Sequence, residues 1–157
     1  MDTKKRMICL SIIVILTLSI PNVAATSANK QKTNVRSSYA MDVPAKEQPL
    51  LLLLFRNNET AVNTSVNTSV EFMGMLATVT QSKINGIEGA TVNIERMNYD
   101  GTWCTADTVA TMSGTFSGCF HFAVIPKEPG TYIFRATYDG NNTYSPAVSN
   151  NIVLKAG

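Results

Sequence analysis

The sequence predicts an all-β domain, an antiparallel β-sandwich of about seven strands. Short runs of residues alternate between apolar and polar side chains, which is typical of half-buried strands. Turn-forming Gly, Pro, Asn and Asp residues recur every 8 to 12 residues between these runs, and no run has helical spacing. The clearest run, Thr131–Tyr138, lies between Pro129-Gly130 and Asp139-Gly140, and its aromatic side chains fall on one face.

The first half of the domain contains three of the predicted strands. Leu50–Phe55 is a compact apolar run that ends at Arg56, and Val70–Thr80 follows it with Phe72 and Leu76 on one face. Ala90–Met97 places Val92 and Ile94 opposite its polar residues.

The second half contains the other four strands. Asp100-Gly101 predicts a hairpin turn into Thr102–Ala110, because these residues tolerate positive φ. A turn ending at Gly114 precedes Thr115–Val124, in which Phe116, Phe120, Phe122 and Val124 face one way. Thr131–Tyr138 and Ala147–Lys155 complete the set.

The alternation also predicts a core, in which the few large side chains supply most of the burial. Replacing Trp103 by Ala in such a core costs about 3–5 kcal/mol. Tyr132, shortly after Pro129, is expected to form a tyrosine corner in which its hydroxyl bonds to upstream backbone. The expected core residues are Phe72, Leu76, Val92, Ile94, Trp103, Phe120, Phe122, Tyr132, Phe134, Val148 and Ile152.

The first 25 residues have the layout of a secretory signal peptide, namely Lys4-Lys5-Arg6, an apolar run over Ile8–Ile20, and small residues that favour cleavage after Ala25. A retained membrane anchor and a buried helix are the alternatives, but the run is shorter than the roughly 20 residues that span a bilayer. Residues 26–49 are polar and predict a flexible, disordered linker, which leaves residues 50–157 as one domain. The expected location is secreted or at the cell surface.

The charge of the chain argues against a nucleic acid as partner. Cleavage after Ala25 removes three basic residues and one acidic residue from totals of 13 and 11, which leaves ten of each. A neutral chain has no basic stripe to neutralise phosphates. Contact with a membrane is expected only through the export signal.

Five segments together resemble a prokaryotic immunoglobulin-like (Ig-like) repeat domain of bacterial and archaeal surface and secreted proteins. The resemblance covers about residues 50–157 and implies an Ig-like sandwich that serves as spacer, stalk or adhesive module without catalysis. This chain departs from the family in having one domain, where tandem copies are frequent, and in having a cysteine pair. The segments are Asp100–Trp103, Gly114–Phe116, Pro129–Tyr132, Arg135–Asn141 and Tyr144–Asn150.

Cys104 and Cys119 are the cysteines that remain after cleavage, and they form a disulfide candidate. If Trp103 lies opposite Phe120 on paired strands, the two cysteines lie opposite each other on the other face, at a spacing that a disulfide needs. Closing this loop would contribute about 3 kcal/mol in the chain-entropy model. The alternative is two thiols in a reducing environment.

Four Asn-x-Ser/Thr sequons, at Asn58, Asn63, Asn67 and Asn141, are glycosylation candidates in predicted loops. Polar surface turns are the alternative explanation for these Asn residues.

The sequence predicts no catalytic centre, metal site or cofactor. His121 is expected to face solvent, and Ser117 and Asp107 nearby have no nucleophile-elbow motif around them. Asp100, Asp107 and Asp139 permit calcium binding, but turn formation explains Asp100 and Asp139 equally well.

The expected function is therefore that of a non-enzymatic module in structural support, adhesion or protein interaction, with an unknown surface protein or glycan as partner. A carbohydrate- or ligand-binding module is the alternative, with Tyr99, Tyr138 and Tyr144 as an aromatic platform. A small secreted enzyme is a third hypothesis. Residues 153–157 contain no recognisable anchor, so a released form and non-covalent attachment both stay open.

Overall fold

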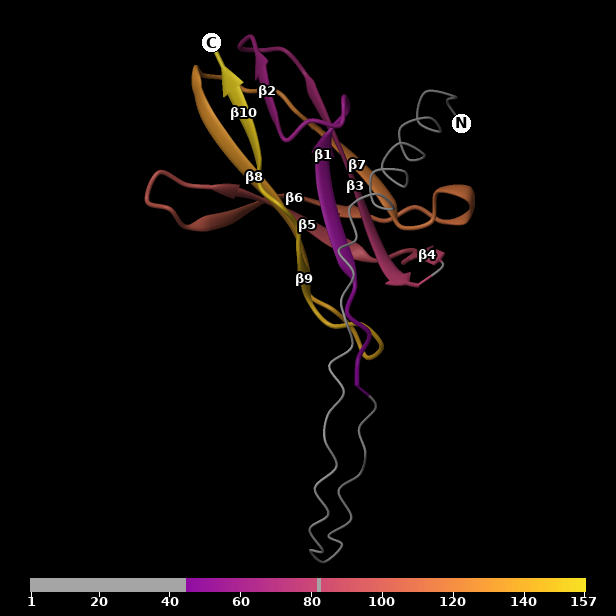
Figure 1. Cartoon of the computed structure of the whole chain (residues 1–157). Coiled ribbons are helices and arrows are strands. Elements are labelled where there is room, and N and C mark those ends of the chain that lie inside the picture. The colour runs from indigo at the N-terminus through magenta and orange to yellow at the C-terminus, as the bar shows by residue number, and fades with distance from the viewer. Residues whose placement is uncertain (1–44, 82) are drawn as a thin grey trace, which may run out of the picture.

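The computed structural model describes residues 45–81 and 83–157, which form two β-sheets packed face to face (Figure 1). The predicted β-sandwich is confirmed. The signal peptide and most of the predicted linker lie outside the described residues. The last residues of the predicted linker, from Ala45, are bound to the domain, since Glu47 N donates to Thr143 O and Glu47 O accepts from Ser145 N.

The first sheet has four strands: β1 (Leu50–Phe55), β3 (Val70–Thr80), β4 (Lys83–Gly86) and β7 (Cys119–Val124). The long strand β3 pairs antiparallel with each of the other three. β1 and β3 are apolar on both faces, so this sheet packs on the core with one face and on a second apolar cluster with the other. Phe116 belongs to that second cluster and not to the predicted row with Phe120, because it lies in a 3₁₀ turn, Gly114–Phe116.

The second sheet contains the remaining strands, in the order β2 (Ala61–Thr64), β10 (Ile152–Ala156), β8 (Gly130–Tyr138), β5 (Thr91–Met97) and β6 (Trp103–Ala110). The two-residue strand β9 (Ala147–Val148) adds to β8. All pairs are antiparallel except β2 with β10, which run parallel. The chain therefore passes from one sheet to the other between β1 and β2.

Each of the seven predicted strands is present, and two of them differ from the prediction by more than a one-residue shift of a boundary. The fifth begins at Cys119 because the 3₁₀ turn occupies its first residues, and the seventh is split into β9 and β10. The four-residue strands β2 and β4 were not predicted.

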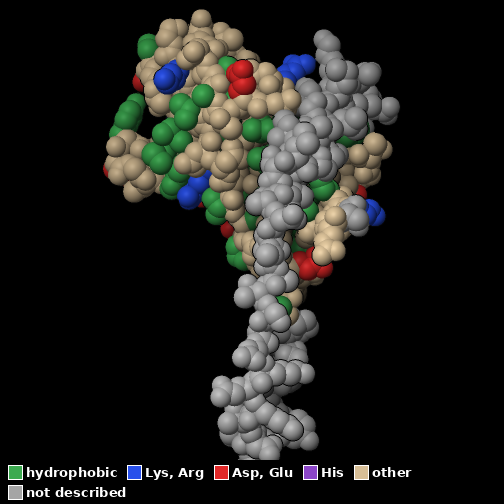
Figure 2. Space-filling view, viewed as in Figure 1, with side chains coloured by type: hydrophobic (Ala, Val, Ile, Leu, Met, Phe, Trp, Pro, Cys, Tyr) green, Lys and Arg blue, Asp and Glu red, His purple; other side chains and the backbone are tan. Residues whose placement is uncertain are grey.

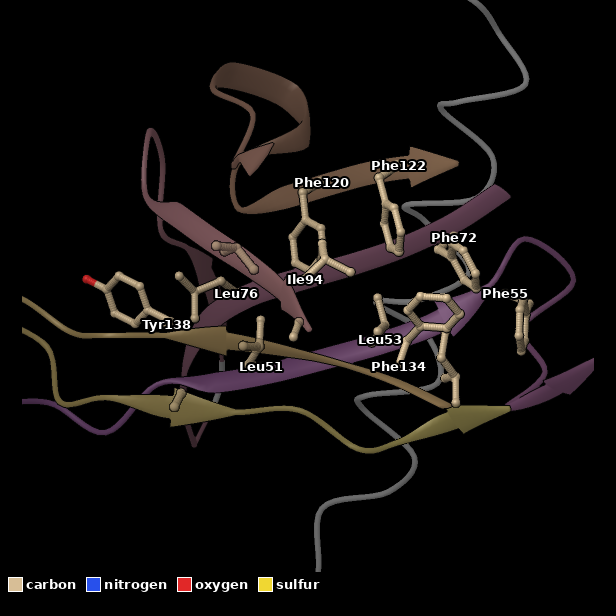
Figure 3. Close-up of a cluster of buried hydrophobic side chains, with 14 of the residues drawn as sticks. Leu51, Leu53, Phe55, Phe72, Leu76, Ile94, Phe120, Phe122, Phe134 and Tyr138 are labelled. Carbon is tan, nitrogen blue, oxygen red and sulfur yellow. The ribbon is translucent and has the colours of Figure 1, made fainter. Parts of the chain in front are cut away.

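The core between the sheets contains five phenylalanines, four of which are in ring contact with one another (Figure 3). The ring centroids of Phe72 and Phe122 are 4.4 Å apart in a stacked pair, and Phe55 and Phe134 lie 4.9 and 5.3 Å from Phe72. Such pairs add to the hydrophobic stabilisation that burial of the rings provides. A Cβ at Gly74 would collide with the ring of Phe120, so only glycine lets that ring lie across β3.

Three predicted core residues lie elsewhere. Trp103 is half-buried on the outer face of its sheet, Val148 is 59% exposed, and Tyr132 packs only at the margin of the core. Val148 was predicted to face the core because the alternation was extended from Ile152 back to Val148. The strand is interrupted at Ser149–Asn151, between β9 and β10, so the alternation does not continue through these residues.

Asn150 links the two sheets through its side chain. Its Oδ1 accepts a hydrogen bond from Leu53 N at 3.0 Å, and its Nδ2 donates to Leu53 O at 2.7 Å. β1 is an edge strand that pairs with β3 on one side. The amide group of Asn150 therefore replaces a neighbouring strand at the centre of β1 and satisfies backbone groups that burial would otherwise leave unpaired.

Candidate functional site

A groove opens between the β5–β6 hairpin, the connection from β7 to β8, and the first half of β8. Its volume is about 870 Å³, within the range of pockets that bind ligands. We call it the edge groove, because it lies where β6 ends the six-stranded sheet. The surface is hollowed beside this hairpin, on the left of the molecule in Figure 2. Residues that characterise its lining are Arg96, Cys104, Val124, Lys127, Tyr132 and Phe134.

The groove exists because the inward-facing side chains of β5 change from apolar to charged along the strand. Val92 and Ile94 are fully buried in the core, but the next residue on that face is Arg96, which is exposed. Arg96 pairs in register with Cys104 on β6 and with Phe134 on β8, so the three side chains share the face that is turned toward the other sheet. A guanidinium group cannot be buried there without a partner, so the layers stay apart at this end.

Two hydrogen bonds hold the wall formed by the β7–β8 connection, one of them from Asn67 N to Pro126 O at 2.8 Å. Tyr132 Oη donates to Glu128 O at 2.8 Å, which is the hydrogen bond expected of a tyrosine corner. This bond fixes the path of Lys127–Gly130 over the groove. Ile125, 44% exposed, adds an apolar side chain to the same wall.

The thiol of Cys104 is half-buried in the groove. Its Sγ lies 3.2 Å from Asn98 Oδ1 and 3.4 Å from Arg96 O, so it donates within its own hairpin. The turn of that hairpin is closed by Asp100, which accepts from both the amide and the hydroxyl of Thr102. These hydrogen bonds lower the pKa of Asp100, the side-chain bond with Thr102 contributing most. Tyr99 projects from this turn, fully exposed, at the rim of the groove.

The outer face of the same sheet carries a stacked group around Trp103. The guanidinium carbon of Arg135 lies 4.1 Å from the centroid of the Trp103 ring, and Arg135 Nε bonds to Glu95 Oε2 at 2.6 Å. The side chains of Arg135 and Glu95 are 27% and 19% exposed, so the pair is partly shielded from solvent. Trp103 thus belongs to a surface cation–π contact and not to the core.

The predicted pairing of Cys104 with Cys119 is wrong. Cys104 lies in β6 of one sheet, and Cys119 lies in β7 of the other, which pairs with β3. β6 and β7 follow each other in the chain but belong to different sheets, so Trp103 and Phe120 are not opposite each other on paired strands. No disulfide joins the two cysteines.

The four sequons lie in different surroundings. Asn63 and Asn67 are exposed, whereas Asn58 is half-buried, with its Oδ1 lacking a hydrogen-bond partner among the described residues. Asn141 Oδ1 accepts from the amides of Thr143 and Tyr144, which makes this residue a turn-former as well. Glycosylation at these positions stays a prediction.

The other side chains considered from the sequence are not brought together. Tyr138 is buried and Tyr144 is half-buried against the core, while Tyr99 lies in the β5–β6 turn, so the three do not form one aromatic platform. His121 is exposed on β7, and Asp107 is in the other sheet. Within residues 45–81 and 83–157, no cluster of three or more His, Cys, Asp or Glu side chains suited to a metal is found, and no helix is long and apolar enough to span a membrane.

The comparisons with known proteins give similarity in structure alone. No family model matches the chain, and no curated protein matches its sequence. A CARDB domain from Pyrococcus furiosus, solved in complex with di-metal ions, is 16% identical with a TM-score of 0.46, over 77% of this chain and 100% of that chain. A PKD domain of an M14-like peptidase from Thermoplasmatales archaeon SCGC AB-540-F20 is 15% identical with a TM-score of 0.40, over 71% and 98% of the two chains. CARDB and PKD domains are Ig-like β-sandwiches.

A variant of a superoxide reductase (neelaredoxin) from Ignicoccus hospitalis is also similar, at 9% identity and a TM-score of 0.40 over 75% of this chain and 86% of that chain. Similarity at these levels does not extend to activity, so the function of this chain is argued from its own residues.

The edge groove was not predicted from the sequence. One signal for it was present, since Arg96 continues the alternation of Val92 and Ile94 and so places a charge at an inward-facing position.

Proposed function

We propose that this chain is an exported, non-enzymatic Ig-like module that binds another macromolecule at the cell surface or after secretion, in adhesion or structural support. The observation that carries the proposal is the edge groove. It combines an apolar floor, an exposed cation and the free side of an edge strand in one concave surface. Interaction modules use loops and strand edges of this kind to hold partners.

Export is proposed from the apolar leader over Ile8–Ile20 and the cleavage point after Ala25. The test is to express the full chain in a secreting host, fractionate the cells, and measure the intact mass of the product. The expected product begins after Ala25 and shows no turnover of ester, peptide or glycoside substrates. Retention of the leader in the membrane fraction would contradict export, and turnover lost on mutating one cluster of residues would contradict a non-enzymatic role.

Carbohydrate binding is a second candidate, and one observation favours it. Tyr99 is a fully exposed aromatic residue at the rim of the edge groove, and exposed aromatic rings stack on sugars. A glycan array probed with the secreted chain and with the Tyr99→Ala variant separates the candidates. Binding that depends on Tyr99 would favour a sugar ligand, and an array without signal would leave the protein-interaction proposal.

A further inference from the structure

We propose that the edge groove binds an extended polypeptide segment that carries a carboxylate, lying beside the free edge of β6. This inference rests on the proposed function and specifies the chemistry of its partner. Three independent features of the groove support it, namely its strand edge, its charges and its floor.

The strand edge is available beside the groove. β6 pairs with β5 on one side only, and alternate residues of an edge strand direct their N–H and C=O groups away from the sheet. In the described part of the chain, no backbone hydrogen bond joins Trp103–Ala106 to β7 or to the β7–β8 connection. An extended peptide can pair with such an edge and so continue the sheet.

A β-bulge in β6 restricts the pairing of a further strand to the part of β6 beside the groove. The register shift at Ile94/Glu95 leaves Ala106 without an opposite residue, and the exposed Asp107 follows it. Bulges and charges of this kind protect an edge against a further strand. The stretch of β6 on the groove side of the bulge is therefore Trp103–Thr105, of which Cys104 and Thr105 line the groove.

The charges of the groove favour an acidic segment. Its charged lining residues are Arg96, Lys127 and Glu128, a net charge of one positive unit. Arg96 and Lys127 take no part in the two ion pairs found among the described residues. A carboxylate that entered the groove would meet an exposed guanidinium beside partly desolvated walls, where a charged pair is stronger than in open water.

The floor of the groove matches the period of a strand. Val124, half-buried, and Ile125, 44% exposed, supply apolar surface, and side chains of an extended peptide alternate between its two faces. Apolar residues and the acidic residue, spaced two apart, would face the groove together, while the intervening polar residues face solvent. A nucleic acid has the required negative charge but lacks this alternation of apolar groups, so the peptide is the better match.

The test measures binding of a fluorescein-labelled Ser-Val-Thr-Glu-Thr-Val-Ser peptide, in which the Val and Glu side chains share one face, to the secreted chain by fluorescence anisotropy. A second peptide with Lys in place of Glu reports the charge preference. We expect the Glu peptide to bind about tenfold more tightly than the Lys peptide, and Arg96→Gln to remove that difference. Lys83→Gln, on β4 of the other sheet, is the matched control and should leave binding unchanged.

Amide shifts in nuclear magnetic resonance spectra locate the bound peptide and show that each variant is folded. Shifts confined to Trp103–Thr105 and the β7–β8 connection support the proposal. Equal affinity for the two peptides, no binding by either, a footprint on β2, or preferential competition by a single-stranded oligonucleotide would each overturn it. Export and turnover are measured separately, so failure here leaves the proposed function standing.

Discussion

Tyr138 carries a polar group that the fold does not satisfy. The residue is 5% exposed, and its hydroxyl has no hydrogen-bond partner among the described residues. Burial raises the pKa of Tyr138, and the neighbouring Tyr144 raises it further. In Figure 3 the ring lies at the far end of the core from Phe55. Burial of the ring stabilises the core, whereas burial of the unpaired hydroxyl lowers the free energy of unfolding.

Tyr138→Phe should therefore raise the free energy of unfolding by about 1 kcal/mol in urea titrations. Because the folded pKa lies above the unfolded one, the wild type loses stability as pH rises beyond about 10, and the variant should not. Tyr132→Phe is the matched control, since it loses the bond to Glu128 O and should cost about 0.5–1.5 kcal/mol. A Tyr138→Phe variant less stable than the wild type would contradict this account.

Trp103 is the residue whose energetic role changes most between sequence and structure. Its half-buried ring stacks on Arg135 at the surface, so Trp103→Ala should cost about 1–2 kcal/mol, less than the cost of truncating a core aromatic. Phe134→Ala, in the same sheet and fully inside, should cost about 3–5 kcal/mol. Circular dichroism in urea measures both. Equal losses for the two variants would show that Trp103 is a core residue after all.

At the scale of elements, the predictions from sequence succeeded where local alternation was sufficient. Strands such as Thr91–Met97 follow from their own residues, but alternation does not say which of the two faces is buried. The alternation was read with Trp103 on the inward face, whereas register with Arg96 places Cys104 inward. The short strand β2 depends on a parallel pairing with β10, some 90 residues later in the chain, and Asn/Thr-rich residues give no local signal for that.

Asn150→Ala tests the link between β1 and the second sheet. The variant leaves the N–H and C=O of the fully buried Leu53 without partners, so it should cost about 2–4 kcal/mol. Asn151→Ala, at the exposed neighbouring position, is the control and should change stability little. Hydrogen exchange at the Leu53 amide should accelerate in the first variant only. Unchanged exchange there would show that β1 does not depend on Asn150.

The turn of the β5–β6 hairpin should respond to acid. The pKa of Asp100 is lowered below its ordinary value of 3.8 by its hydrogen bonds with Thr102, so the stability it contributes is present above that value. It is lost as pH falls through the lower, folded pKa. The amide shift of Thr102 should titrate with a midpoint below 3.8 in the wild type and stay flat in Asp100→Asn. A midpoint at or above 3.8 would contradict the turn geometry.

At the scale of the whole molecule, stability comes from packing between the two sheets and not from a disulfide bond. Five phenylalanines from the two sheets meet in the core, and the cysteines lie on different sheets. The disulfide was expected because alternation placed Trp103 and Phe120 opposite each other on paired strands, but these strands belong to different sheets. Arg96 signalled from the sequence that the apolar row of β5 ends, but the shape of the edge groove depends on how β6 and the β7–β8 connection lie relative to each other, which alternation does not give.

A reducing agent should consequently leave the unfolding transition unchanged. The midpoint of thermal unfolding of the secreted chain, followed by circular dichroism with and without dithiothreitol, should agree within error. Closing a loop of this length contributes about 3 kcal/mol, which would lower the midpoint by several degrees if the bond existed. Such a drop would contradict the separation of the two cysteines.

The described chain enters the sandwich at Ala45 and reaches Gly157 at the opposite end (Figure 1). Glu47 is bonded beside Tyr144 at the entry, and the amide of Gly157 donates to Thr64 O next to the parallel β2–β10 pair. A force that pulled these two points apart would act along the strands. The backbone hydrogen bonds between neighbouring strands would then be loaded together in shear, and they would not break one after another.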